Sequence, residues 1–308
     1  MTQFSRREPV RVKYAGQNAA GGTTSPRYPS SELRWEPVDP RRNYPGELVV
    51  YGNYSLNEAL EQKVGTRVAW LGESRGVCWW SYEFIEDHWD QFDYVLTYDA
   101  SLLKLDDRCI YVPRGECWLE PEDVALYPKS RLVSFISSDK EFPKWGATGH
   151  GFRQDFYQIL TGRRGCLGNR IRRAGIVEQL DCYGKLANRH LPTKLPSLQP
   201  YMFQVAVENM IHDAYFTEKI IDCFATGTIP IFRGTRAVAH HFNRDGIIFV
   251  DTLEDLTDVL VDLSEDDYHR RIEAVRENYE LARAFFSRED LICEYSDILE
   301  WQAAGRAR

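Results

Sequence analysis

The residues best suited to chemistry lie close together in the sequence, between positions 208 and 219. Glu208 and Asn209 follow an apolar run, FQVAV, and the string TEK opens a helical pattern. Thr217 is a preferred N-cap residue, which puts Glu218 and Lys219 in the first helical turn. A helix N-terminus beside an ammonium group favours an anion, so we expect a phosphate or diphosphate to bind there.

Two of these side chains suit the rest of a nucleotide. Glu218 could accept hydrogen bonds from ribose hydroxyls, and Tyr215 offers a flat face for a base. A structural interpretation is equally consistent with the local sequence, because Thr217 and Glu218 can simply cap the helix while Lys219 is a solvated charge. The surrounding elements and motifs must decide between the two.

Short apolar runs that alternate with amphipathic segments surround this cluster. The predicted strands include ELVVYG and RVAWLG early in the chain and FQVAVEN, IPIFRG and IIFVD later. Alternating strand and helix patterns are typical of parallel sheets flanked by helices. We therefore predict an α/β fold of two units in tandem, with ligands at the carboxyl ends of the strands and in a cleft between the units.

Shifts in composition set the predicted domain boundaries. Residues 1–46 are rich in Arg, Pro, Gly and Ser and lack periodicity, which predicts a flexible arm. We assign the first α/β domain to residues 47–128, the second to residues 129–285, and a helical tail to residues 286–308.

The overall composition excludes several classes of protein. Among 308 residues, 38 Lys and Arg stand against 46 Asp and Glu, and the net charge of −8 disfavours a nucleic acid partner. No apolar run is long enough to span a bilayer and the charged start does not resemble a signal peptide, so we expect a cytoplasmic protein. The spacing of Cys and His predicts no metal site, and no tightly bound cofactor is expected. The basic run RRGCLGNRIRR favours a solvated face and leaves peripheral contact with a membrane open.

The residues around Glu208 belong to a longer string that resembles a known signature. Phe, then Glu-Asn, then Tyr-x-Thr-Glu-Lys, then a helix, then Gly-Thr-x-Pro and a final Gly is similar to the signature of glycosyltransferase family 10, the α-1,3/4-fucosyltransferases. The matching residues are Phe203, Glu208, Asn209, Tyr215, Thr217, Glu218, Lys219, Gly227, Thr228, Pro230 and Gly234. The resemblance covers about residues 131–279, and only scattered similarity precedes residue 126.

The resemblance implies a GT-B arrangement of two Rossmann-like domains, with GDP-fucose held by the second and a glycan acceptor by the first. It also implies transfer of fucose with inversion at the anomeric carbon and without a bound metal. Arg153 and Lys219 would clamp the diphosphate, where two cations offset the charge that builds on the leaving group. The other donor contacts would come from Glu208 near the sugar, Glu218 at the ribose, and Tyr215 and Asn209 at the base end and nearby phosphate. His150 shares the Gly-rich string GHGFR with Arg153, and its imidazole could donate to a phosphate oxygen.

Inverting transfer also needs a general base that takes the proton of the acceptor hydroxyl. Glu73 ends the strand RVAWLG within a Gly-Glu string, where the family is similar in setting its base. The nearby aromatic residues Trp79, Trp80 and Tyr82 could stack against an acceptor sugar. An exposed turn carboxylate is the structural alternative for Glu73, and Asp99 is the second candidate base.

Three functions stay open at this point. The leading hypothesis is an inverting fucosyltransferase that uses GDP-fucose. A second keeps the fold but uses another nucleotide sugar, because Arg233 and the Ser-Ser-Asp string at 137–139 depart from the family pattern. A third is a catalytically silent module that binds a nucleotide sugar or a glycan.

Overall fold

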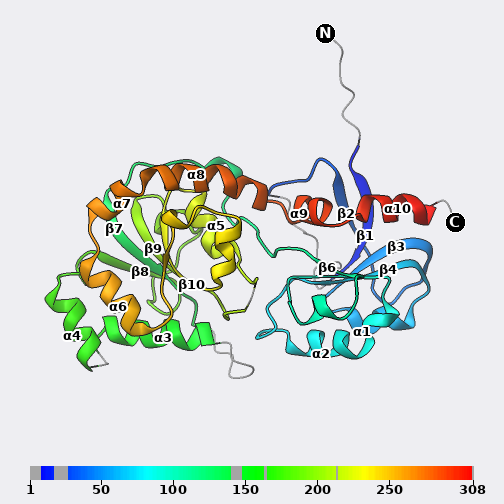
Figure 1. Ribbon diagram of the computed structural model, residues 1–308, viewed down its shortest axis with the longest axis horizontal. Helices are drawn as coiled ribbons and strands as arrows, with labels where there is room; N and C mark the ends of the chain where they lie inside the picture. The colour runs from blue at the N-terminus through cyan, green and yellow to red at the C-terminus, as the bar shows by residue number, and fades with distance from the viewer. Residues whose placement is uncertain (1–7, 17–26, 140–147, 163–164, 213, 307–308) are drawn as a thin grey trace, which may run out of the picture. The chain divides into compact units, whose positions relative to one another are not determined.

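Two parallel β-sheets, one in each half of the chain, organise the structure (Figure 1). The structure is a computed structural model, which describes residues 8–16, 27–139, 148–162, 165–212 and 214–306. The chain divides into two units, residues 1–114 together with 287–308 and residues 115–286.

The first unit contains a six-stranded sheet with the order β2-β1-β3-β4-β5-β6. Its strands are β1 (Val10–Ala15), β2 (Leu33–Pro37), β3 (Tyr44–Gly52), β4 (Val64–Leu71), β5 (Tyr94–Thr97) and β6 (Cys109–Tyr111). Its helices are α1 (Leu56–Glu61), α2 (Trp79–His88), α9 (Arg288–Tyr295) and α10 (Ile298–Arg306). The central strands β3 and β4 end in continuous buried runs, as expected for a parallel sheet that is covered on both faces.

The second unit contains a five-stranded sheet with the order β11-β10-β9-β7-β8. Its strands are β7 (Arg131–Ile136), β8 (Leu180–Tyr183), β9 (Tyr201–Val207), β10 (Ile229–Arg233) and β11 (Ile248–Phe249). Its helices are α3 (Thr148–Leu160), α4 (Gly165–Arg173), α5 (Glu218–Phe224), α6 (Leu253–Asp262), α7 (Glu265–Arg270) and α8 (Ile272–Ala282). Helices α5 and α8 pack together on one side of the sheet, and α3, α4 and α6 form a group on the other (Figure 1). All seven residues of β9 are buried, so this strand is the centre of the core and its end is a fixed platform.

Short 3-10 helices connect several of these elements. They are Trp89–Gln91, Leu102–Lys104, Pro121–Asp123, Leu195–Ser197, Arg236–His240, Arg244–Gly246 and Arg283–Phe285.

The predicted strands fall on observed ones, and the predicted helix after Thr217 is α5. The N-terminal arm is different. Residues 1–46 include β1, β2 and the start of β3, and β1 is hydrogen-bonded between the other two. Strands β1 and β2 escape detection because they are short and alternate buried residues such as Val12 and Trp35 with charged ones.

The boundaries also differ from the predicted ones at 128 and 286. Residues 115–128 belong to the second unit, where the backbone N–H of Trp118 donates to Asp222 at 2.8 Å. The helices α9 and α10 belong to the first unit, and Trp301 stacks on Tyr94 with ring centroids 3.6 Å apart. No sequence signal marks either assignment. The 115–128 segment has little regular structure, and the pattern of an amphipathic helix does not specify which sheet the helix covers.

Among the described residues, no helix has the length and apolar character needed to cross a membrane. The predicted cytoplasmic location stays a prediction.

A half-buried lysine joins the amino-terminal ends of strands β9 and β10 in the second unit. The ammonium of Lys129 donates to the carbonyl oxygens of Leu198 (3.2 Å), Gln199 (3.2 Å) and Thr226 (2.7 Å) and to the hydroxyl of Thr228 (2.9 Å). These acceptors are uncharged, and burial lowers the pKa of Lys129 to about 7. The charged form is therefore less favourable here than in the unfolded chain.

This lysine predicts a pH dependence of stability. Between about pH 7 and its ordinary pKa, the folded state binds fewer protons at Lys129 than the unfolded state, so the unfolding free energy rises with pH. The contribution to the slope is at most about 1.4 kcal/mol per pH unit. Urea unfolding between pH 7 and 8.5 should show a shallower rise for Lys129→Met than for the wild type. The exposed-lysine control Lys185→Met should keep the wild-type slope, and equal slopes for Lys129→Met and wild type would contradict the assignment.

Candidate functional site

The end of β9 carries a buried carboxylate that caps helix α5. Glu208 is fully buried, and its Oε1 accepts from the backbone N–H of Thr217 at 2.8 Å and from the Thr217 hydroxyl at 2.9 Å. The first residues of α5 are thus held by a carboxylate from the neighbouring strand, which is the charge that a helix N-terminus favours. The structure places Glu208 where the sequence analysis put an incoming phosphate.

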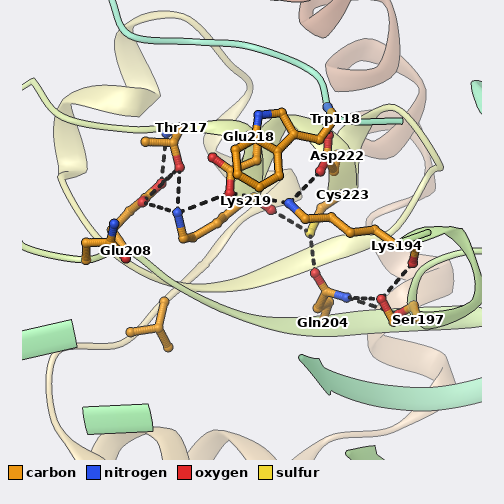
Figure 2. Close-up of polar contacts among 12 residues, drawn as sticks. Trp118, Lys194, Ser197, Gln204, Glu208, Thr217, Glu218, Lys219, Asp222 and Cys223 are labelled. Carbon is orange, nitrogen blue, oxygen red and sulfur yellow. Dashed lines mark hydrogen bonds and ion pairs between the residues drawn. The ribbon is translucent and has the colours of Figure 1, made fainter. Parts of the chain in front are cut away.

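Lys219 lies between two carboxylates in the first turn of α5 (Figure 2). Its Nζ is 3.2 Å from Oε2 of Glu208, 3.2 Å from Oε1 of Glu218 and 2.9 Å from the hydroxyl of Thr217. About a fifth of the side chain, 21%, is exposed. The ammonium is therefore held in a defined position but is reachable from solvent.

The same network continues to a second lysine that the sequence analysis missed. Nζ of Lys194 lies 2.8 Å from Asp222 and 3.3 Å from Glu218, and it sits 4.5 Å from the ring centroid of Trp118 (Figure 2). Burial alone would lower the pKa of Lys194, but the carboxylates of Asp222 and Glu218 outweigh it and raise the pKa. Burial raises the pKa of Asp222, against the effect of Lys194. An acidic residue inside the apolar helical run IIDCF is the one sequence signal that could have revealed this pair.

The positive charges of Lys194 and Lys219 are already balanced by carboxylates of the same network. Two ammonium groups and the three carboxylates of Glu208, Glu218 and Asp222 leave a formal charge of −1. An anionic ligand must therefore compete with Glu208 and Glu218 for Lys219, and a cation besides the two lysines is needed to make the site attractive to a diphosphate.

Arg153 of α3 can supply this further positive charge. It is 6% exposed, and its Nε (3.1 Å) and Nη2 both donate to the carbonyl oxygen of Val207, while Nη2 also donates to Oδ1 of Asn209 at 2.9 Å. Burial lowers the pKa of Arg153, and the more distant charge of Glu208 acts against this effect. Within the part of the chain that the structure describes, no carboxylate pairs with this guanidinium.

A glycine permits this arrangement. Helix α3 begins at Thr148, so Gly149 lies in its first turn, and its N–H donates to the carbonyl oxygen of Asn209 at 3.1 Å. A Cβ at Gly149 would lie 1.8 Å from the carbonyl oxygen of Glu208. The start of α3 therefore approaches the end of β9 more closely than any other residue type allows.

We expect Gly149→Ala to destabilise the protein by about 2 kcal/mol or more, because the clash is with backbone and must displace α3. The matched control is Gly151→Ala, in the same helix, where a Cβ would meet nothing within 4 Å. That variant should be neutral or gain up to about 1 kcal/mol from helix propensity. Thermal unfolding of both variants measures the difference, and equal stability would contradict the packing described here.

The other predicted donor residues are buried. Tyr215 is 2% exposed and His150 is 5% exposed, in the first turn of α3. The Tyr215 ring presents no open face, so stacking on a base would require the ring to move. Glu218 is also buried, and its Oε1 is engaged by two ammonium groups rather than open to a ribose.

Glu73 lies in the first unit, two residues after the end of β4, and both its N–H and its carbonyl oxygen are hydrogen-bonded. Oδ1 of Asn53 accepts from the N–H groups of Gly72 and Glu73, both at 2.9 Å. The hydroxyls of Tyr82 and Tyr98 donate to the carbonyl oxygen of Glu73, the latter at 3.0 Å. Burial raises the pKa of Tyr98, which keeps its hydroxyl protonated as a donor.

The carboxylate of Glu73 is left outside this backbone clamp. Its side chain is 38% exposed, and Oε1 lies 3.8 Å from Nη2 of Arg114. On the same unit, the exposed rings of Tyr54 and Trp80 lie 5.9 Å apart. An accessible carboxylate on a rigid backbone has the properties that a general base requires.

The second candidate base is not available. Asp99 is fully buried, pairs with Nε of Arg75 at 2.9 Å, and accepts from the N–H groups of Ser101 and Leu102 at 2.9 and 3.3 Å. It is the capping carboxylate of the turn that follows β5 and has no free route to a substrate proton. The burial and ion pair of Asp99 argue against it as a base, and Glu73 stays the candidate for the proposal below.

The second unit brings together seven of the eight predicted site residues, and the eighth, Glu73, lies in the first unit. The seven are His150, Arg153, Glu208, Asn209, Tyr215, Glu218 and Lys219. Direct contacts join Arg153 to Asn209 and Lys219 to Glu208 and Glu218. Among the described residues, no group of three or more His, Cys, Asp or Glu is arranged to hold a metal ion.

Comparison with solved structures defines the class of fold. A crystal structure of an α1,3-fucosyltransferase with GDP is similar over 97% of this chain and 93% of its own, with 19% identity and a TM-score of 0.54. The same type of enzyme with GDP-fucose is similar over 97% and 94%, with 16% identity and a TM-score of 0.53. Anabaena HepE in complex with UDP is similar over 96% and 100%, with 9% identity and a TM-score of 0.54. These likenesses confirm the predicted α/β fold with two Rossmann-like units of the GT-B class.

The C-terminal part of the chain also matches a family model. Residues 168–306 match glycosyltransferase family 10 (fucosyltransferase), C-terminal part. This match includes Glu208, Glu218 and Lys219 and confirms the resemblance to the family 10 fucosyltransferases.

Proposed function

We propose that the protein transfers fucose from GDP-fucose to a hydroxyl group of a glycan, with inversion at the anomeric carbon. The observation that carries the proposal is Arg153, a buried guanidinium without a carboxylate partner among the described residues, beside the end of β9 in a fucosyltransferase family fold. A nucleoside diphosphate supplies the negative charge that this position lacks.

The proposed donor site uses both cations. Arg153 and Lys219 contact the diphosphate, and Lys219 exchanges part of its interaction with Glu208 and Glu218 for phosphate oxygens. The exposed fifth of its side chain makes this exchange accessible. The roles at the base, ribose and phosphates that the resemblance implies for Tyr215, Asn209 and His150 belong to this proposal and require contacts that form when the donor binds.

The proposed reaction is a single displacement. The acceptor oxygen attacks the anomeric carbon of fucose, the bond between that carbon and the β-phosphate oxygen breaks, and the electron pair leaves with GDP. The carboxylate of Glu73 takes the proton of the acceptor hydroxyl. Arg153 and Lys219 stabilise the charge that develops on GDP, and attack opposite to the leaving group inverts the configuration.

A second candidate keeps the same chemistry but another nucleotide sugar. The observation that favours it is Arg233, which stands at the end of β10 where the family signature often has an aromatic or small residue. The silent binding module is the outcome to be expected if the Glu73 carboxylate does not act on an acceptor.

The test is release of nucleoside diphosphate from a panel of GDP- and UDP-sugars, with and without a glycan acceptor. We expect GDP release from GDP-fucose that depends on the acceptor, and an α-fucoside as product. Release of nucleoside diphosphate from a UDP-sugar, but not from GDP-fucose, would establish the second candidate. Binding of GDP-fucose without release in any acceptor mixture would favour the silent module.

A further inference from the structure

Arg233 is the last residue of β10, and it points to a role that the family signature does not assign. In the sheet, Arg233 pairs in register with Val207, the residue whose carbonyl oxygen Arg153 binds. The backbone N–H of Glu208 also donates to the carbonyl oxygen of Arg233 at 2.9 Å. The two arginines therefore reach the same edge of the sheet, one from a strand and one from α3.

The guanidinium of Arg233 is poorly satisfied by the protein. Its Nε donates to the backbone carbonyl oxygen of Asp251 at 3.1 Å, and its Cζ lies 4.5 Å from the ring centroid of Phe152. The carboxylate of Asp251 is taken by Arg236 instead. Nη1 of Arg233 is buried and has no hydrogen-bond partner within the described ranges. Leaving a buried donor of a charged group without an acceptor is unfavourable.

The charge of Arg233 also reaches Arg153. Burial lowers the pKa of each guanidinium, and the charge of Arg233 lowers the pKa of Arg153 further. Neither guanidinium forms an ion pair with a carboxylate among the described residues. Two desolvated like charges at one edge of a sheet are unfavourable unless an anion neutralises both.

We propose that Arg233 binds the diphosphate of the donor together with Arg153, so that the two guanidinium groups rather than Lys219 alone hold the anion. A planar guanidinium donates two parallel hydrogen bonds to phosphate oxygens, and it is less strongly hydrated than an ammonium group. Lys219 is already engaged by Glu208 and Glu218, whereas Arg233 has unused donors. This inference rests on the proposed donor site and adds a residue to it that the signature lacks.

The test is calorimetric titration of wild type and Arg233→Gln with inorganic pyrophosphate, GDP, UDP and guanosine. We expect Arg233→Gln to weaken pyrophosphate and GDP binding by about 10-fold or more and to leave guanosine binding unchanged. The control is Arg170→Gln, which removes one positive charge from an exposed pair with Asp258 in the same unit. Arg170→Gln shows how much affinity is lost when one positive charge is removed from the unit away from the site.

Each other outcome decides the matter. Equal affinities for Arg233→Gln and Arg170→Gln, or no binding of pyrophosphate and GDP by the wild type, would overturn the inference. If Arg233→Gln does not fold by circular dichroism, Arg233→Lys replaces it, and the loss of the planar fork should weaken pyrophosphate binding by about 3-fold or more. Unchanged affinity in that variant would overturn the inference. If the wild type binds UDP and pyrophosphate but not GDP, the proposed donor fails while the pyrophosphate comparison still tests Arg233.

Discussion

Replacement of Lys219 by Ala is expected to cost both donor affinity and stability. In the folded chain the ammonium lies 3.2 Å from both Glu208 and Glu218 and 2.9 Å from the Thr217 hydroxyl. Without it, the fully buried carboxylate of Glu208 keeps its hydrogen bonds to Thr217 but loses its cation. Removing one partner of a buried pair costs about 3–5 kcal/mol of unfolding free energy. Because Lys219 is partly exposed, we expect a loss at the lower end, about 3 kcal/mol.

Stability and donor binding of this variant are measured separately, and binding is measured under conditions where the variant is folded. Urea unfolding gives the loss of free energy, and calorimetric titration with GDP-fucose at low temperature gives the affinity. We expect affinity to fall by about 100-fold, because a charge-assisted contact to the diphosphate is lost and the site gains net negative charge. The exposed-lysine control Lys185→Ala should change neither quantity. Wild-type affinity in a destabilised Lys219→Ala variant would mean that the ammonium serves only the fold.

Glu73→Gln is expected to bind the donor normally and to stop turnover. The proposed role of the carboxylate is to take the acceptor proton, and general-base catalysis typically contributes about 10²- to 10⁴-fold. The hydrogen bonds of Asn53, Tyr82 and Tyr98 are to backbone atoms of Glu73, so the substitution leaves these bonds in place. A fall of kcat within that range, with an unchanged affinity for GDP, would therefore report on the carboxylate itself.

The control for this variant is Glu86→Gln on α2. Glu86 pairs with Nη1 of Arg75 at 2.8 Å and is 40% exposed, similar to Glu73. It should keep wild-type turnover. Normal turnover by Glu73→Gln would remove Glu73 from the mechanism, and no carboxylate named here would then serve as the base.

The central strands could be predicted from the sequence because burial on both faces produces continuous apolar runs, as in β4, β9 and β10. The arm could not be predicted correctly. The strands β1 and β2 lie at one edge of the sheet and carry Arg11, Lys13, Arg34 and Glu36 between their buried residues. Five or six alternating residues in a Pro- and Arg-rich stretch give too weak a pattern to outweigh the composition.

The residue types of the site could be predicted, but their partners could not. Lys194 lies in an irregular loop 28 residues from Asp222, and only the folded sheet brings the two together. A place for Glu208 near the donor sugar stays a prediction, and the bond of its carboxylate to the N-terminus of α5 was not foreseen. Such pairings depend on tertiary contacts that local pattern does not encode, and this is also why the unused donors of Arg233 became visible only in the structure.

The central claim is that cations at the carboxyl ends of β9 and β10 hold the diphosphate of the donor. A crystal structure of the complex with GDP tests it most directly. We expect diphosphate oxygens within about 3 Å of the Arg153 guanidinium and the Lys219 ammonium. A diphosphate bound elsewhere, with Lys219 still held between Glu208 and Glu218 and Arg153 still bound only to Val207 and Asn209, would contradict the claim.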